Sequence, residues 1–448
     1  MLTDEFMTVN QPSHHLQRFI SSYGMVFVLL LLMLLFTILT WKEQTPGGTE
    51  AGHQVAETIL ALNDQAIVVV AAGTSTVEHA FVRAAQERLS AGGATVVKTV
   101  AGQPSDARRA IKETLDNNIT LTHLAVSGTA DRWTVFDHFD VSRLGQRVAP
   151  SSYSWPVFAQ KNNLLSVADQ TAIYAVIAVG MTMVIITGGI DLSVGSLVAL
   201  ASVMAAVVVR AMGGMDAGTG AILVAVAAGL GVCSAAGAFH GVMVTQFRIP
   251  PFIVSLSMMM MARGLAYLLA EGESISAVPR SWTAIGNGKA LGIPVPVLMM
   301  IALYIVAHVV MTQTAFGRYV YAVGGNQEAA RLCGVPVRRV LLTVYIICGT
   351  LAGVGGLILS SKLNTGDPKL GHMYELEVIA AVVVGGTSLM GGEGRILGTL
   401  IGAFIIAVIK NGMNLLNVGA FEQDIILGAV LLTAVLLDNI KRQRSDGR

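Results

Sequence analysis

The sequence is poor in charged residues and in cysteine. Charged residues make up 13% of the 448, against roughly 25% in a typical soluble domain, whereas apolar residues make up 53%. This composition excludes an ordinary soluble enzyme. The formal net charge of +1 gives no indication of a nucleic-acid partner. The three cysteines, Cys233, Cys333 and Cys348, lie in or beside apolar stretches, so we expect no disulfide framework.

Catalytic and metal-binding signatures are also missing from the sequence. It contains no G-x-x-x-x-G-K-[ST] phosphate loop, no H-E-x-x-H motif and no paired C-x-x-C motifs, and its nine histidines are scattered. The glycine-rich segment 385–392 lacks the lysine of a phosphate cradle, and close helix packing with a turn explains it better. We therefore predict that the chain is not an enzyme and holds no metal and no cofactor.

Long apolar stretches fill most of the chain. A helix needs about 20 mostly apolar residues to cross the hydrocarbon core of a bilayer. The first stretch, Tyr23–Trp41, is too long for the apolar part of a cleavable signal peptide. The predicted fold class is an all-α polytopic membrane protein with about ten transmembrane helices. The predicted spans are 21–41, 168–188, 192–212, 219–245, 251–270, 293–313, 338–360, 376–391, 396–415 and 423–438.

Lysine and arginine predict the orientation of these spans. If the N-terminus is cytoplasmic and ten spans follow, the C-terminus is cytoplasmic too. The inner loops and the basic tail 441–448 then hold more Lys and Arg than the short outer loops, as the positive-inside rule requires. We expect a first span within 1–41, an insert at 42–155 and the main transmembrane domain at 156–440.

The insert differs from the rest of the chain because it is water-soluble in character. Residues 42–153 hold 22 of the 57 charged residues. Along it, short apolar runs that are typical of strands alternate with segments whose apolar residues recur at helical spacing. This order predicts a small α/β domain of βαβαβ order with a parallel sheet. Ser105 is the predicted N-cap of its second helix. The predicted strands are 65–72, 94–100 and 121–127, the predicted helices are 77–89 and 105–117, and topology predicts an extracytoplasmic position.

The segment 185–196 is the first candidate site. Gly188 and Gly189 can interrupt a membrane helix, and Asp191 follows where the next apolar run begins. A charged group at membrane depth is expensive and is by default a functional candidate. Asp191 and Ser193 are also good N-cap residues, so the segment could simply restart a helix. The two interpretations are compatible.

The segment 317–335 is the second candidate site. It predicts a short amphipathic helix, Gln327–Cys333, framed by glycines in the largest inner loop. Such a helix could dock into a cleft of a partner protein or lie on the bilayer surface. Its alanine pair and few large apolar residues favour docking.

Residues 180–196 and 317–334, together with a third segment from Tyr374 to Gly394, closely resemble ribose/xylose/galactose-type ABC importer permeases. The resemblance covers about residues 160–440. It implies a bacterial inner-membrane permease that forms a homodimer or heterodimer with a second permease, binds a separate ABC ATPase, and receives a small sugar from a periplasmic binding protein. ATP and Mg²⁺ would be bound by the ATPase.

The resemblance also implies roles for particular residues. A coupling helix near 326–334 would contact the ATPase, with Asn326, Glu328, Ala329, Ala330 and Gly334 as the matching positions. The matching positions near the central pathway are Gly188, Gly189, Asp191 and Ser193. On the next helix, Phe252 and Ser255 fit a substrate pathway only loosely.

Other functions compete with sugar import. A permease for branched-chain amino acids or another small nutrient is an alternative within the same class. An ion-coupled secondary transporter is disfavoured, because Asp191 looks nearly alone as an intramembrane charge and its motif is not repeated in an inverted half. A sensor would need a cytoplasmic output domain, and no inner loop is long enough.

The insert departs from the family pattern, since members usually have a short first outer loop. Residues 67–126 resemble the opening βαβαβ of sugar-binding proteins of the same system, which is about half of one lobe. A complete two-lobed sugar clamp cannot be built from it. The insert could be a docking platform for, or remnant of, a binding protein, or a structural cover without a ligand.

Overall fold

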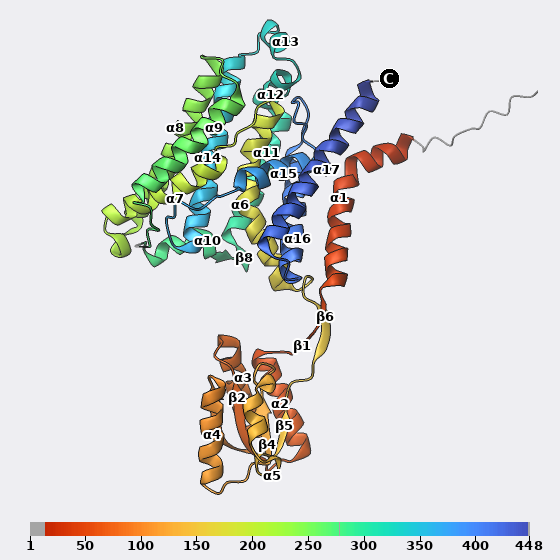
Figure 1. Cartoon of the computed structure of the whole chain (residues 1–448), viewed down its shortest axis with the longest axis vertical. Coiled ribbons are helices and arrows are strands. Elements are labelled where there is room, and N and C mark those ends of the chain that lie inside the picture. The colour runs from red at the N-terminus through yellow and green to blue at the C-terminus, as the bar shows by residue number, and fades with distance from the viewer. Residues whose placement is uncertain (1–13, 277, 447–448) are drawn as a thin grey trace, which may run out of the picture. The chain divides into compact units, whose positions relative to one another are not determined.

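The computed structural model describes residues 14–446 except residue 277, and the chain divides into two compact units (Figure 1). Unit 2 is the continuous segment Trp41–Pro156, and unit 1 is formed by the chain on either side of it, up to Thr40 and from Val157. The predicted insert, 42–155, lies within unit 2.

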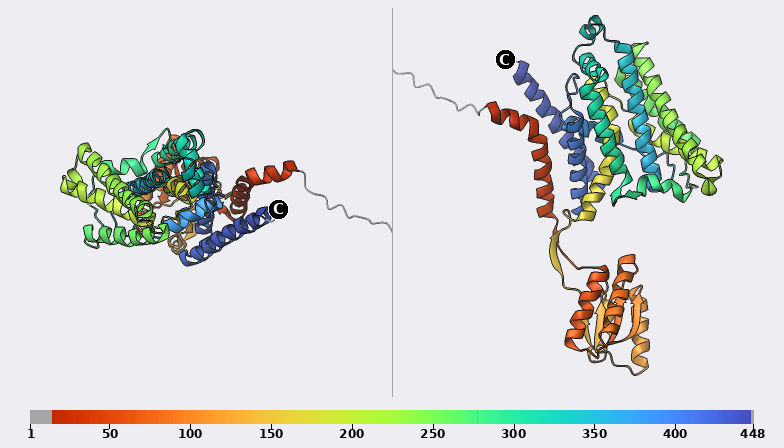
Figure 2. Two further views of the ribbon diagram at one scale, coloured as in Figure 1. Left: turned by 90° about the horizontal axis from the view of Figure 1, so that it is seen from above. Right: turned by 180° about the vertical axis from the view of Figure 1, so that it is seen from behind.

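Unit 1 is built from long apolar helices that run roughly side by side (Figure 2). Short 3-10 helices and a two-stranded hairpin connect some of them. The α-helices are α1 His14–Leu39, α6 Lys161–Ile186, α7 Val194–Ala211, α8 Thr219–Thr245, α9 Pro251–Leu269, α10 Thr283–Asn287, α11 Val295–Gln313, α12 Ala315–Gly325, α13 Gln327–Leu332, α14 Val337–Leu363, α15 Tyr374–Val384, α16 Ile396–Leu415 and α17 Ala420–Asp446. The remaining elements are η3 Gly214–Asp216, η4 Arg280–Trp282, β7 Lys289–Ala290 and β8 Ile293–Pro294.

In the described part of the chain, seven helices are long and apolar enough to cross a membrane: α6, α7, α8, α9, α11, α14 and α16. They correspond to seven of the ten predicted spans. The span predicted at 376–391 is wrong in extent, because α15 has only 11 residues and ends before the glycine pair at 385–386. Gly386 has a φ of 85°, a backbone conformation that ends the helix. The spans predicted at 21–41 and 423–438 fall on α1, whose described part includes the apolar stretch Gly24–Leu39, and on α17; both helices extend beyond the side chains that the structure describes, so these two spans stay predictions.

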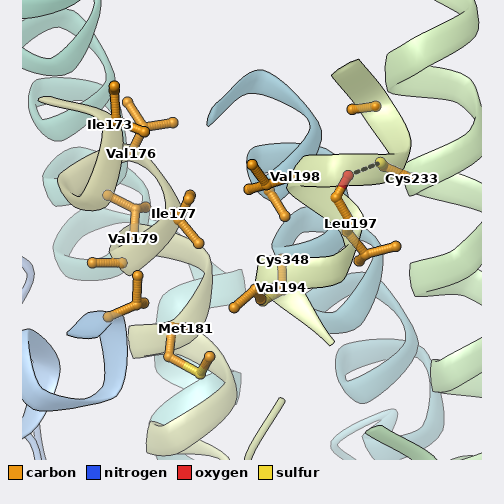
Figure 3. Close-up of a cluster of buried hydrophobic side chains, with 14 of the residues drawn as sticks. Ile173, Val176, Ile177, Val179, Met181, Val194, Leu197, Val198, Cys233 and Cys348 are labelled. Carbon is orange, nitrogen blue, oxygen red and sulfur yellow. Dashed lines mark hydrogen bonds between the residues drawn. The ribbon is translucent and has the colours of Figure 1, made fainter. Parts of the chain in front are cut away.

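Burial separates the central helices of unit 1 from the outer ones. In the most apolar window of each helix, 83% of α6 and 72% of α7 is buried, against 22% of α8 and 28% of α9. Figure 3 shows part of the core between them, in which the Cys233 thiol of α8 donates a hydrogen bond to the carbonyl oxygen of Leu197 of α7 at 3.3 Å. The outer helices expose large apolar side chains, such as Leu223 and Leu268, which suits a lipid environment.

Unit 2 is a four-stranded parallel sheet with helices on both faces. The strand order is β3-β2-β4-β5. Side chains of β2 alternate between the faces: Val68 and Val70 pack with α2 and α3, and Val69 and Ala71 pack with α4. The elements are β1 Trp41–Gln44, α2 Gly48–Leu62, β2 Ile67–Ala72, α3 Thr76–Ala91, β3 Thr95–Ala101, α4 Pro104–Asp116, β4 His123–Val126, η1 Ala130–Arg132, η2 Thr134–His138, α5 Val141–Leu144, β5 Gln146–Val148 and β6 Tyr153–Pro156.

The predicted βαβαβ order of unit 2 is confirmed as β2-α3-β3-α4-β4. The predicted N-cap Ser105 is wrong, since α4 begins at Pro104 and its N-cap is Gln103, whose backbone N–H donates to Asp106 at 2.9 Å. α2 and β5 were not predicted from the sequence. The two-stranded stem, in which β1 pairs antiparallel with β6, was not predicted either.

An open α/β sheet of this kind usually binds a ligand between the carboxyl ends of the two strands where the chain reverses direction. These strands are β2 and β4. Glu78 lies there: its carboxylate accepts from the Gly73 backbone N–H at 3.2 Å and from the Thr129 hydroxyl at 2.6 Å. Thr45 packs directly against Gly128 in the same region. Glu78 and Thr129 are therefore bonded to each other at this position, and Thr45 lies close to Gly128.

Phe81→Ala is expected to destabilise unit 2 by about 3–5 kcal/mol. Phe81 of α3 is fully buried against α2 and the sheet, so its loss leaves a cavity. The measurement is protease digestion of the detergent-solubilised full chain along a temperature series. Val77→Ala, on the same helix but at a side chain 55% exposed, is the matched control and should change little. Equal resistance of the two variants would contradict the assigned core.

Candidate translocation and coupling site

Three segments far apart in the sequence meet at one end of unit 1. They are the break between α6 and α7, the end of α12, and the glycine-rich loop between α15 and α16. The carbonyl oxygen of Ile186 accepts from the Gly392 backbone N–H at 2.8 Å. The Tyr321 hydroxyl donates to the carbonyl oxygen of Gly394 at 2.8 Å. A β-carbon on Gly324 would lie 1.8 Å from the Ile186 oxygen, so this approach requires glycine.

The helix break predicted at Gly188–Gly189 is present. α6 ends at Ile186 and α7 begins at Val194, and Gly188 has a φ of 79°. Gly189 lies against Tyr345 of α14: a β-carbon there would come within 2.5 Å of the tyrosine hydroxyl. Glycine therefore permits both the turn and the close contact.

Asp191 is buried inside this break, with 1% of its surface exposed. Its Oδ1 accepts from the Ser193 backbone N–H at 2.9 Å and from the Ser193 hydroxyl at 2.6 Å. Ser193 occupies the N-cap position of α7, but its side chain caps no helix N–H. The capping interpretation is therefore wrong for Ser193: its hydroxyl donates to Asp191, which holds the turn before the helix.

Two further helices complete the surroundings of Asp191. His240 of α8 places Nδ1 3.7 Å from Asp191 Oδ2, and both residues are 1% exposed. The His240 ring stacks on Tyr345 at 4.1 Å between centroids. Cys348, one turn further along α14, lies beside Asp191 and beside Val194 (Figure 3). None of these three neighbours was predicted from the sequence. The one signal that could have indicated them is a histidine, His240, within an otherwise apolar helix.

The predicted coupling helix is α13, slightly shorter than expected. The side-chain oxygen of Asn326 caps it by accepting from the Ala329 backbone N–H at 2.9 Å, and Gly334, with a φ of 82°, follows its end. Glu328 pairs with Arg331 on the surface at 2.7 Å. Ala330 is buried, so it anchors α13 to unit 1. Ala329 is exposed, and so is Leu332, with 82% of its surface accessible.

The two loosely predicted pathway residues make no described bond to Asp191. Phe252 of α9 is 50% exposed, and the Ser255 hydroxyl donates to the Phe252 carbonyl within the same helix at 3.0 Å. Among the described hydrogen bonds and ring contacts, none joins either residue to Asp191. In the same part of the chain, no group of three or more His, Cys, Asp or Glu side chains is placed to hold a metal.

The expectation that Asp191 is nearly alone as a charge in the transmembrane domain is wrong. A second polar cluster contains Arg263 of α9, Glu375 and Glu377 of α15, and Lys410 of α16. A separate ion pair joins Asp169 of α6 to Lys362 of α14. The sequence does not predict that these charges meet, because they lie far apart along the chain, within apolar stretches or beside a predicted loop. Only the packing of the helices brings them together.

Known proteins resemble the transmembrane part of the chain. Residues 163–435 match the family described as branched-chain amino acid transport system / permease component. Ribose import permease protein RbsC of Escherichia coli strain K12 is 44% identical over 293 residues, which is 64% of this chain and 88% of the relative. RbsC of Bacillus subtilis strain 168 is 42% identical over 288 residues, covering 64% and 87%. The L-arabinose ABC transporter permease protein AraH of Azospirillum brasilense is 37% identical over 296 residues, covering 66% and 85%. No solved structure matches the chain.

Proposed function

This chain belongs to the family of branched-chain amino acid transport system permease components, and from that membership we propose that it is the membrane subunit of an ATP-driven monosaccharide importer. The family confirms the predicted resemblance and the prediction of a transport subunit without a cofactor of its own. It also disfavours the ion-coupled alternative. The similarity to ribose and arabinose permeases favours a sugar over a branched-chain amino acid.

One observation carries the mechanism: the helix break with Asp191, the end of α12 and the glycine-rich loop are in direct contact. α13 follows α12 after a single residue, Asn326. A movement of α13 would therefore pass through α12 to the backbone of the break at Ile186. Such a connection lets ATP binding by a partner change which way the transport pathway opens.

The proposed arrangement has α13 and both termini in the cytoplasm, with an ABC ATPase bound to α13. A binding protein would deliver the sugar at the opposite side, and a second permease would complete the pathway. The bacterial inner membrane is the location that this assembly requires. The Lys and Arg asymmetry of the loops supports this orientation.

The experiment that tests the proposal is purification of the tagged protein from mild detergent with mass measurement of the intact complex. A permease dimer that carries an ATPase, and whose ATP hydrolysis rises with a sugar-loaded binding protein, supports it. A particle without an ATPase, recovered repeatedly from native membranes, overturns it.

For unit 2 we propose a docking or covering role rather than a sugar site. At the position where a sheet of this kind binds ligands, the Glu78 carboxylate is already bonded to Gly73 and Thr129, and Thr45 lies against Gly128. Deletion of residues 50–150 separates the two roles: loss of uptake with the ATPase still bound supports docking of the binding protein, and full uptake supports a cover.

Leu332→Glu is expected to reduce recovery of the ATPase with the permease at least tenfold. Leu332 is a large apolar side chain, 82% exposed at the end of α13, and a charge in the centre of a protein contact costs about 2 kcal/mol or more. The measurement is co-purification of the ATPase from mild detergent. The same substitution at Leu291, which is 98% exposed between β7 and β8 at the other end of α11, is the control and should retain the ATPase. Normal recovery with Leu332→Glu would remove α13 from the proposed contact.

A further inference from the structure

The second polar cluster of unit 1 has an arrangement that a structural ion pair does not need. Lys410 Nζ of α16 lies 2.8 Å from Glu377 Oε1 of α15. The same ammonium group lies over the ring of Tyr174 of α6, 5.5 Å from its centroid. The Tyr174 ring packs on that of Tyr374, with 4.6 Å between centroids. An ion pair and two aromatic rings from three helices therefore lie together.

The cluster continues toward α7 through a second acid and a second base. Glu375 lies against the first turn of α7, since a β-carbon on Gly195 would come within 2.2 Å of its Oε2. Arg263 of α9 reaches the same turn of α7, since its Nε donates to the Ser196 hydroxyl at 3.3 Å. Two carboxylates and two cations from three helices, α9, α15 and α16, are thus gathered around the start of α15.

Hydrogen-bonding capacity in this cluster is left unused. Among the described residues, Oε2 of Glu375 and Oε2 of Glu377 are buried and have no hydrogen-bond partner. A buried carboxylate oxygen without a donor is costly, so such atoms usually indicate an absent ligand or a functional role. The Glu377 and Lys410 side chains are 15% and 28% exposed, which leaves the cluster accessible from the surface of unit 1.

The charge balance indicates what kind of ligand fits. Glu375 and Glu377 offset Arg263 and Lys410, so the four groups carry no net charge and do not favour an ion of either sign. The unpaired carboxylate oxygens can accept hydrogen bonds from the hydroxyl groups of a ligand. The ammonium and guanidinium groups can donate hydrogen bonds to the oxygens of the same hydroxyl groups. The two tyrosine rings offer an apolar surface for C–H groups and hydroxyls at their edges. This combination suits a neutral polyhydroxy molecule.

We propose that these six residues form a polyol cluster, which recognises the hydroxyl groups of the monosaccharide as it crosses the membrane. The polyol cluster comprises Tyr174, Arg263, Tyr374, Glu375, Glu377 and Lys410. The proposal rests on the proposed function and assigns sugar recognition to the start of α15, whereas the Asp191 break transmits movement from α13. The polyol cluster is a transit site, so the sugar must bind it weakly enough to leave.

The test uses the complete complex, with its ATPase and binding protein, reconstituted in liposomes with radiolabelled D-ribose and L-arabinose. Two quantities are measured: sugar uptake, and the ATP hydrolysis that the loaded binding protein stimulates. Glu377→Gln should lower uptake about tenfold or more, as expected when a charged hydrogen-bonding partner is lost, while stimulated hydrolysis stays within about twofold. Tyr174→Phe keeps the ring, and the loss of its hydroxyl should lower uptake of one or both sugars about fivefold.

A structural role predicts a different pattern. If Lys410 and Glu377 only stabilise each other, the double variant Glu377→Gln with Lys410→Gln should recover uptake, because no charge is left unpaired. Recognition predicts that the double variant stays as impaired as Glu377→Gln alone. The matched control is Asp169→Asn with Lys362→Gln, which removes a comparably buried ion pair of unit 1. This pair also has an unpaired carboxylate oxygen but lies outside the polyol cluster, so its loss should leave uptake within about twofold.

The outcomes separate the two proposals. Recovery in the double variant, or normal uptake by both Glu377→Gln and Tyr174→Phe, overturns the polyol cluster. A wild-type complex that hydrolyses ATP but takes up neither sugar, nor any other neutral sugar offered with the binding protein, overturns the proposed function instead. If Glu377→Gln fails to assemble, Tyr174→Phe decides the question alone, since it removes a single oxygen atom.

Discussion

The Gly324→Ala variant is expected to lose ATP-driven sugar uptake almost completely. The added methyl group would lie 1.8 Å from the carbonyl oxygen of Ile186 and 2.7 Å from the backbone nitrogen of Gly392. Both are backbone atoms, so no side chain can rotate away, and α12 must separate from the helix break. Because this contact joins α12 to the helix break in the proposed coupling route, we expect uptake below about one-tenth of wild type, with a loss of stability of about 1–3 kcal/mol from the overpacking.

Gly325 supplies the control for this prediction. It is the next residue on α12, and a β-carbon there would meet nothing within 4 Å. Gly325→Ala should therefore transport normally in the same liposome assay, at the same expression level. Wild-type uptake by Gly324→Ala would show that the close approach of α12 to Ile186 is not required for transport. The proposed coupling route through this contact would then be wrong.

The second large effect is expected at Asp191. In Asp191→Ala, the backbone N–H and hydroxyl of Ser193 lose their acceptor inside a site that is 1% exposed, and His240 loses its neighbouring carboxylate. Leaving buried donors unpaired costs about 1–3 kcal/mol each. We expect a clearly lower unfolding temperature for the detergent-solubilised complex and uptake reduced tenfold or more.

The substitution Asp191→Asn distinguishes geometry from charge at this position. Asparagine keeps an oxygen that can accept both bonds from Ser193, so a positioning role predicts that most uptake returns. Asp216→Ala, at an exposed aspartate in the loop after α7, is the control for removing an acidic residue and should behave as wild type. If Asp191→Asn is as impaired as Asp191→Ala, the negative charge itself is needed and the positioning role is wrong.

Hydrophobic length and helical spacing were sufficient to predict most elements of this chain. Seven apolar stretches became spanning helices, and the alternation within 65–127 predicted the βαβαβ order of unit 2 to within a few residues. The failures have physical causes. α2 was not predicted because it begins with glycine and threonine and carries a histidine and two glutamates, which leaves a narrow apolar face. The predicted span at 376–391 joined the short helix α15 to the loop after it, because glycine counts as neutral in an apolar run.

The candidate site was predictable only where the chain is locally unusual. Gly188, Gly189 and Asp191 break the apolar pattern, and Asn326 and Gly334 frame a short helix, so these were visible. His240 and Tyr345 reach Asp191 from α8 and α14, and which face of an apolar helix points inward cannot be read when all faces are apolar. The same reason hid the meeting of Glu377 with Lys410.

The way unit 2 joins the rest of the chain bears on how such a protein could arise. β1 and β6 pair residue for residue, from Trp41 with Pro156 to Gln44 with Tyr153. On either side of this stem, the residues of unit 1 that flank it are bonded to each other: the Val157 backbone N–H donates to the Thr40 carbonyl oxygen at 3.0 Å. A gene could therefore gain or lose the whole of unit 2 at this junction, with only a tight turn needed to reconnect α1 to α6. The junction is thus a place where evolution, or an engineer, can exchange unit 2 for another domain while the sequence of unit 1 stays the same.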